Sequence, residues 1–419
     1  MNSAVTTLWE EAGFPEQTVI QRAVSDPLLA GQSVVGIAPT GSGKTLAYGI
    51  PVLTRLVPNL GPQLLIIVPA QELAIQIRDV LTPLAHRLNL GVLGLIGSAN
   101  RQRQIDRLKG KPAVIVATLG RLADLIDERK LRLVDIKTVI VDEFDSFETE
   151  DITTIRHMRQ DGLLAGANLG LFSATRNDDD IAAFRELWPD LQVFDETKTD
   201  DTRGPVTHYL LDRQFEGKVQ FLERLGREKH QRVFVFFNHK HIMQKVAGSL
   251  RFTHVPYSLL ATDGRQVQRA EALGDFRRGR TNLLLTTDVA ARGLDVADVT
   301  AVVNFELPNN ITTYIHRTGR TGRMGESGTV YNMGNDHDLR DLRHLLGDSV
   351  TLVAEKPLVK KREQDDETND ENTPSTDSHD RARTRPASDK MPARKPTAAK
   401  SHNKRKQRWR NKKNVGKHW

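Results

Sequence analysis

Short runs of apolar, often β-branched residues recur along most of the chain and are separated by longer mixed segments. Each run is too short for a helix and is typical of a strand buried on both faces. The longer segments suit crossover helices, for example over residues 71–88 and 177–187. Alternating strands and helices predict parallel, doubly wound α/β sheets. The predicted strands are Val34–Ile37, Leu64–Val68, Ala113–Ala117, Thr138–Val141 and Leu169–Phe172 in the first half, and Val233–Phe237, Leu283–Leu285 and Ala301–Val303 in the second.

A polar segment separates the two groups of strands. Residues 195–205 read DETKTDDTRGP, a charged stretch ending in Gly-Pro that is typical of an exposed linker. We therefore expect one domain over residues 1–196, a linker over 197–205 and a second domain over 206–356. Beyond this point apolar residues are rare, so the chain buries too little surface to offset its ordering entropy. We expect residues 357–419 to form a disordered tail.

The charge of the chain is concentrated in that tail. The chain of 419 residues has 60 Lys+Arg and 53 Asp+Glu, a formal net charge of +7. Residues 381–419 contain 15 Lys+Arg and one acid, whereas residues 363–380 contain eight acids and no Lys or Arg. The remaining 362 residues are nearly neutral, with 45 basic and 44 acidic side chains. The sequence thus predicts a neutral body that carries a basic arm behind an acidic spacer.

Several classes of protein are excluded or disfavoured by composition. The chain has no cysteine, which excludes disulfides, thiolate zinc sites, cysteine-ligated Fe–S clusters and a cysteine nucleophile. No apolar run reaches the roughly 18 residues that a membrane helix needs. The N-terminus lacks the pattern of a signal peptide. We therefore expect a cytoplasmic protein that does not contact membranes.

The first predicted strand runs into a glycine-rich turn, APTGSGKT, over residues 38–45. Gly41 and Gly43 would let backbone N–H groups approach phosphate oxygens at the positive end of the following helix. Lys44 would reach the β- and γ-phosphates, and Thr45 would offer its hydroxyl to Mg²⁺. The common form of this loop begins with Gly where this chain has Ala38, so the match is to its Gly-Lys-Thr end.

Two adjacent carboxylates close another predicted strand. Asp142 is a suitable Mg²⁺ ligand, and Glu143 beside it can polarise an attacking water. Taken alone, the run Asp142–Asp145 fits a helix start with capping acids equally well. Together with Lys44 and Thr45, it favours hydrolysis of ATP or GTP.

The second half contains HRTGRTGR over residues 316–323. Arg317, Arg320 and Arg323 follow one another at three-residue spacing, and their guanidinium groups can project toward a polyphosphate. The planar donors of arginine stabilise the charge of a phosphoryl group in transfer. Without a phosphate loop elsewhere, a basic surface turn would be the better interpretation. With one in the other domain, we favour arginines that reach across an interdomain cleft.

These motifs, in this order, resemble those of the DEAD-box family of ATP-dependent RNA helicases, bacterial type, from about residue 14 to about residue 333. The resemblance implies two RecA-like domains, ATP and Mg²⁺ as ligands, and RNA-stimulated ATP hydrolysis coupled to local unwinding of short RNA duplexes. It implies that Phe14 stacks on adenine, Gln21 bonds to the adenine edge and Asp295 contacts the ribose. The implied site residues are Phe14, Gln21, Ala38, Pro39, Thr40, Gly41, Ser42, Gly43, Lys44, Thr45 and Asp295 for ATP; Thr45 and Asp142 for the metal; Lys44, Asp142, Glu143, Arg320 and Arg323 for catalysis; and Ser173, Ala174, Thr175 and His316 for coupling hydrolysis to domain closure.

The family contacts the backbone of one RNA strand with both domains. The resemblance assigns this role to Pro69, Gln71, Gly97, Thr118 and Arg121 in domain one, and to Asn238, Gln266, Arg269 and Thr287 in domain two. Domain one departs from the family pattern. PTRELA appears as PAQELA, the paired glycines as Gly97-Ser98, TPGR as TLGR and DEAD as DEFD, with Phe144 in place of alanine.

Apart from Phe144, these departures lie on the RNA-facing side of domain one. We therefore expect ordinary ATP binding but weak or selective RNA binding by the core, with the basic arm as a tether. The suggested substrates are ribosomal precursors or other structured RNAs in ribosome assembly or RNA turnover. Two alternatives stay open: a DNA helicase or translocase built on the same motor, and a non-catalytic RNA clamp or scaffold.

Overall fold

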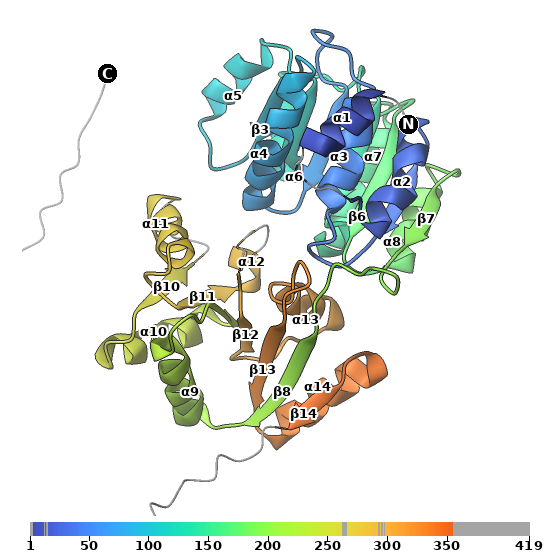
Figure 1. Cartoon of the computed structure of the whole chain (residues 1–419). Helices are drawn as coiled ribbons and strands as arrows, with labels where there is room; N and C mark the ends of the chain where they lie inside the picture. Colours follow the sequence, from blue (N-terminus) through green and yellow to red (C-terminus); the bar gives the residue numbers. More distant parts are fainter. Residues whose placement is uncertain are drawn as a thin grey trace, which may run out of the picture. The chain divides into compact units, whose positions relative to one another are not determined.

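The computed structural model describes residues 3–11, 13, 16–261, 266–291, 294, 296 and 298–354. These residues form two parallel α/β sheets with helices on both faces (Figure 1). Phe14, Asp295 and the predicted tail lie outside the described residues. Within the described part of the chain, no helix is both long and apolar enough to cross a bilayer.

The first sheet contains seven described strands, and every neighbouring pair is parallel. Its order is β3 (Val92–Leu95), β4 (Val114–Thr118), β2 (Leu64–Val68), β5 (Thr138–Asp142), β6 (Asn168–Ser173), β1 (Val34–Ile37) and β7 (Gln192–Asp195). The central strands are buried on both faces, as their continuous apolar runs predict.

Two apolar layers cover the faces of this sheet. One layer includes residues of α1 (Ser3–Glu11), α2 (Val19–Leu29), α3 (Lys44–Leu53) and α4 (Gln71–Arg87). The other involves α5 (Arg101–Leu108), α6 (Leu119–Asp127), α7 (Thr149–Gln160) and α8 (Asp178–Arg185). Alternate residues of each strand belong to opposite layers, for example Ile66 to the first and Ile67 to the second.

The second sheet repeats the arrangement. Its described order is β10 (Tyr257–Leu260), β11 (Leu283–Thr287), β9 (Val233–Phe237), β12 (Ala301–Asn304), β13 (Gly328–Gly334), β8 (Val206–Asp212) and β14 (Leu352–Ala354), again with parallel neighbours. Its helices are α9 (Phe215–Arg227), α10 (Lys240–Phe252), α11 (Gln266–Arg277), α12 (Asp288–Ala291), α13 (Ile311–Thr318) and α14 (Asp336–Leu346). Short 3-10 turns lie at Phe144–Ser146 in the first domain and at Gly347–Ser349 in the second. The predicted fold of two tandem doubly wound sheets is confirmed.

All eight predicted strands are present, with ends shifted by at most two residues. The other six strands were not predicted, and most lie toward the edges of the sheets, where one face is less buried. Strand β13 is central but was missed because Asn332 interrupts its apolar residues. Asn304 donates to the side chain of Asn332 at 2.8 Å, so the buried polar group is satisfied.

The predicted linker joins β7, which ends at Asp195, to β8, which begins at Val206. Part of this linker forms backbone hydrogen bonds with domain two. The N–H of Gly204 donates to the carbonyl of Gly322, and the N–H of Gly325 donates to that of Thr202, each at 3.1 Å. The last part of the linker is therefore paired with the loop that carries Arg323.

Candidate nucleotide site and RNA-facing surface

The glycine-rich turn lies between the end of β1 and the start of α3. Gly41 and Gly43 have φ angles of +93° and +83°, in the region that glycine adopts without strain. A Cβ atom on Gly43 would lie 2.3 Å from Nε2 of Gln21. The backbone of this turn therefore requires its glycines, and it presents the first N–H groups of α3 as an anion site.

Lys44 is partly buried in the turn. Its ammonium donates to the carbonyls of Ala38 and Pro39 at 2.7 and 2.9 Å. Burial lowers the pKa of Lys44, and the nearby carboxylates of Asp142 and Asp145 partly oppose this shift. A cation held among carbonyls and carboxylates is suited to an incoming polyphosphate.

Asp142 ends β5 and is 3% exposed. The hydroxyl of Tyr48 donates to it at 2.8 Å, as does the N–H of Glu143 at 2.9 Å. Burial and the charge of Glu143 raise the pKa of Asp142 to about 6, against the opposing effect of Lys44. Asp142 and Thr45 line one cavity of about 460 Å³, and these oxygen donors fit Mg²⁺, which binds through few protein ligands plus phosphates and water.

Glu143 combines an unfavourable backbone conformation with an unpaired side-chain oxygen, a combination typical of functional sites. Its φ and ψ are 51° and 45°, a left-handed conformation that costs a residue with a Cβ free energy. Its Oε2 atom is buried and has no hydrogen-bond partner among the described residues. Glu143 lines the same cavity, and a carboxylate with an unsatisfied oxygen fits a group that orients and deprotonates a water.

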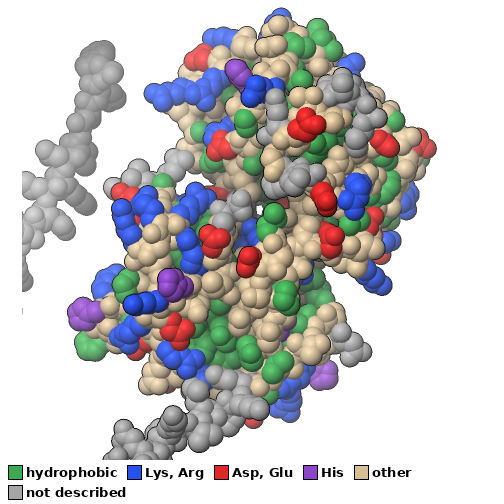
Figure 2. Space-filling view, in the orientation of Figure 1, with side chains coloured by type: hydrophobic (Ala, Val, Ile, Leu, Met, Phe, Trp, Pro, Cys, Tyr) green, Lys and Arg blue, Asp and Glu red, His purple; other side chains and the backbone are tan. Residues whose placement is uncertain are grey.

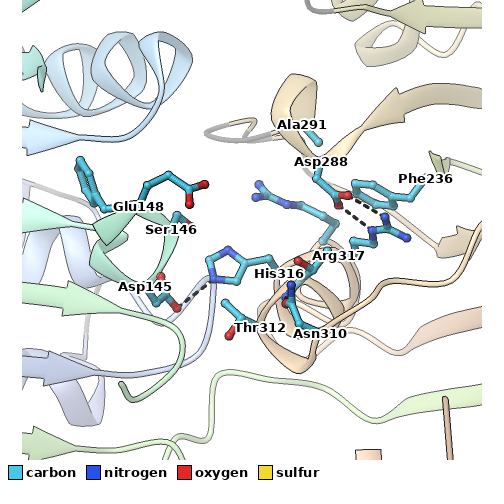
Figure 3. Close-up of a pocket in the computed structure, with 13 residues that line it drawn as sticks. Asp145, Ser146, Glu148, Phe236, Asp288, Ala291, Asn310, Thr312, His316 and Arg317 are labelled. Atoms are coloured by element: carbon cyan, nitrogen blue, oxygen red, sulfur yellow. Dashed lines mark hydrogen bonds and ion pairs between the residues drawn. The ribbon is translucent and has the colours of Figure 1, made fainter. Parts of the chain in front are cut away.

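Asp145 connects three motifs that are distant in sequence. Figure 3 shows its contact with His316. Its Oδ2 accepts from Nε2 of His316 and from the N–H of Thr175, both at 3.0 Å, and also from the hydroxyl of Thr175. The hydroxyl of Ser173 in turn donates to the carbonyl of Thr175. One carboxylate therefore links the DEFD segment, the segment Ser173–Thr175 and the arginine-rich segment.

The three arginines of HRTGRTGR do not share one role. Arg320 and Arg323 line the same cavity as Lys44 and Asp142. Arg323 also packs against the phosphate turn, since a Cβ on Gly41 would lie 3.5 Å from its Cγ. The prediction that all three guanidinium groups project toward a polyphosphate is wrong for Arg317, which is 1% exposed.

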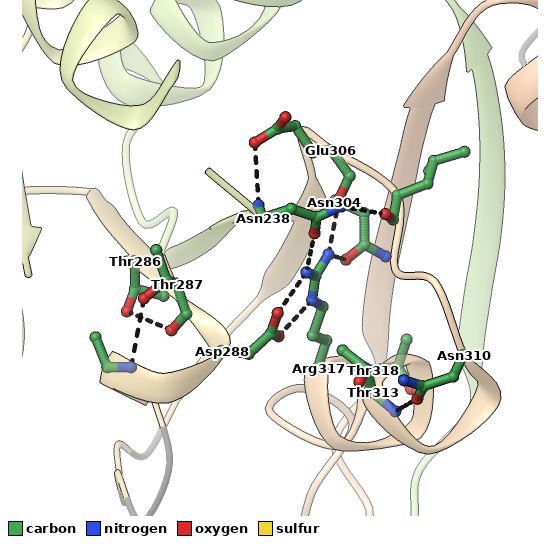
Figure 4. A network of polar contacts seen from close by, with 12 residues as sticks. Asn238, Thr286, Thr287, Asp288, Asn304, Glu306, Asn310, Thr313, Arg317 and Thr318 are labelled. Atoms are coloured by element: carbon green, nitrogen blue, oxygen red, sulfur yellow. Dashed lines mark hydrogen bonds and ion pairs between the residues drawn. The ribbon is translucent and has the colours of Figure 1, made fainter. Parts of the chain in front are cut away.

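Arg317 instead organises the interior of domain two (Figure 4). Its guanidinium donates to both carboxylate oxygens of Asp288, at 2.6 and 2.7 Å. Further bonds reach the side chains of Asn238 and Asn304 and the carbonyl of Glu306. This network fixes the ends of β9, β11 and β12 relative to α13.

Comparison with known proteins agrees with this geometry. Residues 18–184 match the DEAD/DEAH box helicase family, and residues 217–325 match the helicase conserved C-terminal domain. The chain is 33% identical over 335 residues to the DEAD-box ATP-dependent RNA helicase CshC of Bacillus cereus, covering 80% of this chain and 86% of that protein. This chain belongs to the DEAD-box family of ATP-dependent RNA helicases. It is an RNA-dependent ATPase and RNA helicase.

Two further comparisons support the assignment of this DEAD-box helicase. It is 32% identical over 358 residues to the ATP-dependent RNA helicase SrmB of Escherichia coli, covering 83% of this chain and 79% of that protein. The structure of S. cerevisiae Dbp5 bound to RNA and ADP BeF3 matches with a TM-score of 0.73 at 25% identity, covering 84% of this chain and 93% of Dbp5. The likeness extends over both sheets.

Two of the five residues assigned to RNA in domain one of the helicase, Gln71 and Arg121, bond to the loop that contains a third, Gly97. Oε1 of Gln71 accepts from the N–H of Ser98 at 3.1 Å, and Arg121 donates to the carbonyl of Gly97 at 2.8 Å. Two further nitrogens of Arg121, Nε and Nη1, are buried without hydrogen-bond partners among the described residues, and Nε lies 3.8 Å from a carboxylate oxygen of Asp124. Buried guanidinium donors without acceptors are suited to a phosphate. Pro69 and Thr118 lie at the ends of the adjacent strands β2 and β4.

The residues assigned to RNA in domain two are positioned differently. Both ends of the Asn238 amide are engaged within the domain, with the carbonyl of Leu307 and with Arg317. Arg269 forms an ion pair with Glu72 at 3.0 Å and donates to the carbonyl of Ala290. Thr287 ends β11, and Gln266 begins α11. Their contacts with RNA stay a prediction.

Gln21 also has contacts within the fold. Its Oε1 accepts from the N–H of Thr18 at 2.9 Å, and its Nε2 donates to the carbonyl of Gly43 at 3.2 Å. The hydroxyl of Thr18 donates to the carbonyl of Ser42. These bonds tie the start of α2 to the phosphate turn, so the residue assigned to the adenine edge also supports the loop.

Sequence reasoning missed the roles of Tyr48, Asp145 and Asp288. Tyr48 follows the phosphate turn by one helical turn, which places it on the Asp142 side of α3, but an apolar core role explained it equally well. Asp288 follows the predicted strand Leu283–Leu285 after two threonines, much as Asp142 follows Thr138–Val141, and that signal was available. The partner of Asp288, Arg317, became evident only from the tertiary structure.

The His316–Asp145 contact predicts a dependence on pH. Burial favours neutral His316, but the hydrogen bond and charge of Asp145 outweigh it, so the pKa of His316 is raised above 6.5, and that of Asp145 is lowered. A raised histidine pKa means that the pair contributes fully below pH 6.5 and is lost as the pH rises through the raised value. Glu143 adds to this effect and Arg320 opposes it.

We expect the RNA-stimulated ATPase to decline on the alkaline side in a way that depends on His316. In His316→Gln, the glutamine can donate a hydrogen bond to Asp145 but carries no charge. We expect the alkaline decline in the ATPase rate to disappear in this variant, and the ATPase rate at low pH to fall. Rates measured across pH 6 to 9 check this. An unchanged alkaline limb in the variant would assign it to another group.

Proposed function

We propose that this helicase uses Lys44, Asp142 and Glu143 of domain one, with Arg320 and Arg323 of domain two, to hydrolyse ATP and thereby separate short RNA duplexes or remodel ribonucleoprotein particles. The observation that carries the proposal is the shared carboxylate of Asp145. It receives Thr175 from domain one and His316 from domain two, so the hydrolytic site and the segment bearing the arginines are mechanically joined.

Each residue has a distinct part in the proposed reaction. Lys44 and the N–H groups of the turn bind the phosphates, and Glu143 orients the attacking water and accepts its proton. Arg320 and Arg323 stabilise the negative charge that develops on the γ-phosphate. Mg²⁺ held by Thr45 and Asp142 would neutralise phosphate charge. Loss of the γ-phosphate removes the contact that holds the two arginines, which resets the domains.

The comparison of RNA with DNA tests this proposal. We expect RNA to stimulate ATP turnover by the full chain, and DNA of equal length and sequence to stimulate it far less. Equal stimulation would favour the DNA translocase. RNA binding without ATP turnover would favour the non-catalytic clamp or scaffold.

The missing arginine at position 71 predicts a weak RNA contact in domain one. In Gln71→Arg, we expect RNA affinity to rise and the slope of log affinity against log salt to steepen by about 0.7 per added phosphate contact. Gln71→Ala is the control, because it removes the bond to Ser98 without adding charge. Salt titrations of RNA binding provide the slopes, and equal slopes in all three proteins would contradict the prediction.

The proposed substrates are structured RNAs such as ribosomal precursors. The family and the ATP and RNA site support this proposal. Crosslinking the protein to RNA in its own cells and sequencing the attached RNA tests the proposal. Recovery of ribosomal precursor sequences would support it, and recovery of unrelated messages alone would contradict it.

A further inference from the structure

The edge of the first sheet beyond β3 carries a basic groove that the reaction does not use. Residues 1–196 are acidic overall, with 25 Asp+Glu against 19 Lys+Arg. Within them, residues 97–111 contain five Lys+Arg and one Asp. Figure 2 shows Lys and Arg side chains gathered where α5 lies in Figure 1. Basic residues are thus concentrated on one edge of an acidic domain.

Two cavities lie along this edge, between α4, β3 and α5. The smaller, about 190 Å³, is lined by Arg78, Arg103 and Arg107 and, among the described residues, by no acidic side chain. The larger shares Arg78 and Arg107 and adds Arg87 and His86, with Asp79 as its acidic residue. Asp79 is paired with Arg78 at 2.6 Å. The arginines of α5 are therefore not neutralised by this carboxylate.

Helix α5 is fixed in place by polar contacts. The side chain of Gln104, which is 4% exposed, exchanges two hydrogen bonds with the backbone of Ile96 and donates to the carbonyl of Ala99. Asn100 caps the helix through the N–H of Arg103 at 3.0 Å. Arg103 and Arg107 are both exposed, and one helical turn separates them, so they lie on the same face.

We propose that this groove, the α4–α5 groove, binds the phosphates of RNA that extends past the strand held by the core. Its position supports RNA as the occupant. The loop Gly97–Asn100 joins the residues assigned to the RNA backbone directly to α5, and Ala99 and Asn100 line the smaller cavity. The groove would supply charge near the position where Gln71 replaces an arginine. This inference rests on the RNA path proposed above.

A series of single-stranded RNAs of increasing length tests the α4–α5 groove in the full chain. In Arg103→Ala/Arg107→Ala, we expect unchanged affinity for the shortest RNAs that stimulate ATP turnover. For longer RNAs, the salt slope should fall by about 1.4, at 0.7 per lost phosphate contact. The control Arg132→Ala/Lys137→Ala removes the same charge just before β5, at the opposite end of that strand from Asp142, and should leave the slope unchanged.

Three outcomes would overturn the inference. Equal loss at every RNA length would place the two arginines on the core path, and equal loss in the control would indicate only net charge. Tighter RNA binding in the double variant would indicate that the acidic residues 363–380 occupy the groove instead. Whichever outcome is found, the ATP turnover that short RNA stimulates tests the proposed function independently of the α4–α5 groove.

A second, independent observation concerns the linker. An antiparallel bridge pairs Arg203 with Arg323, and it is flanked by the two backbone bonds of Thr202 and Gly204. A Cβ atom on Gly204 would lie 1.9 Å from the carbonyl oxygen of Glu326. Position 204 therefore requires glycine because two backbones cross there.

Asp200, at the other end of the same segment, lies near the phosphate turn, since its charge partly opposes the lowering of the Lys44 pKa. Oδ1 of Asp200 accepts from the N–H and hydroxyl of Thr202 at 3.0 and 2.6 Å. Oδ2 of Asp200 is buried without a hydrogen-bond partner among the described residues. Residues 200–204 thus form a short segment, here called the strap, that joins domain one to the loop of Arg323. The hydrogen bonds of Asp200, Thr202 and Gly204 hold it in place.

We infer that Gly204 is a positioning residue for Arg323, and that the strap transmits domain closure to this arginine. A structural role alone would alter folding, whereas a positioning role lowers kcat at nearly constant ATP affinity. In Gly204→Ala, we expect kcat of the RNA-stimulated ATPase to fall by up to ~10²-fold, as expected for a catalytic group displaced by about 1 Å.

Gly248→Ala is the matched control, since a Cβ at Gly248 of α10 meets no atom within 4 Å. It should leave kcat unchanged. If Gly204→Ala fails to fold, Asp200→Ala, which removes the brace without a clash, should lower kcat in the same direction. Normal kcat in a folded Gly204→Ala protein, or in Asp200→Ala, would overturn the inference.

Discussion

Replacing Glu143 with glutamine is expected to lower the kcat of ATP hydrolysis by about 10²–10⁴-fold, the usual contribution of a general base. Glutamine keeps the shape of the side chain but cannot accept a proton from water. ATP and RNA binding should persist, because neither depends on this charge. The left-handed backbone of Glu143 and its unpaired buried oxygen are the structural grounds for this role.

Glu150→Gln provides the control for this prediction. It makes the same chemical change at an exposed position in the first turn of α7. We expect its effect on kcat to be negligible. Steady-state ATPase rates with saturating RNA measure both variants. Comparable rates in Glu143→Gln and the wild type would show that another group activates the water.

Replacing Arg317 with alanine is expected to lower the free energy of unfolding by about 3–5 kcal/mol, the usual cost of breaking a buried ion pair. The change leaves Asp288, Asn238, Asn304 and the carbonyl of Glu306 without their donor. Asp288 is itself 32% exposed, so water recovers part of the loss. Arg317→Lys should also destabilise the domain, because one ammonium cannot replace the planar fork.

Urea denaturation of the full chain measures this effect in the transition of domain two. Arg340→Ala on the exposed surface of α14 is the control and should change stability by less than about 0.5 kcal/mol. An Arg317→Ala protein that unfolds at the wild-type urea concentration would contradict the structural role.

Much of the fold was predictable because its central strands are continuous apolar runs. Val34–Ile37, Leu64–Val68 and Val233–Phe237 have the predicted ends, since burial on both faces leaves no polar position within them. β7 and β14 lie at the edges of their sheets, where exposed positions interrupt the pattern. A short apolar run is therefore a reliable sign of a central strand and a poor guide to an edge.

The sequence also identified some residues of the candidate site and not others. Lys44 and Asp142 were identified because chemistry fixes their spacing from a strand end. The residue types alone could not distinguish Arg317 from Arg320, because Thr-Gly follows both, and only the resemblance to the family assigned Arg320 and not Arg317 to catalysis. Only the folded domain shows that Asp288 and two asparagines surround the first, whereas the second lines the nucleotide cavity. The contacts of Asp145 and the strap to Arg323 likewise join segments far apart in sequence.

We propose that domain two completes the ATP site through its arginines. The most direct test is the ATPase rate of Arg323→Ala with and without saturating RNA, together with its ATP affinity. The loss of an arginine that stabilises the transferred phosphoryl group is expected to lower the RNA-stimulated rate by ~10³-fold or more, at nearly wild-type ATP affinity. An RNA-stimulated rate in Arg323→Ala close to that of the wild type would contradict the account.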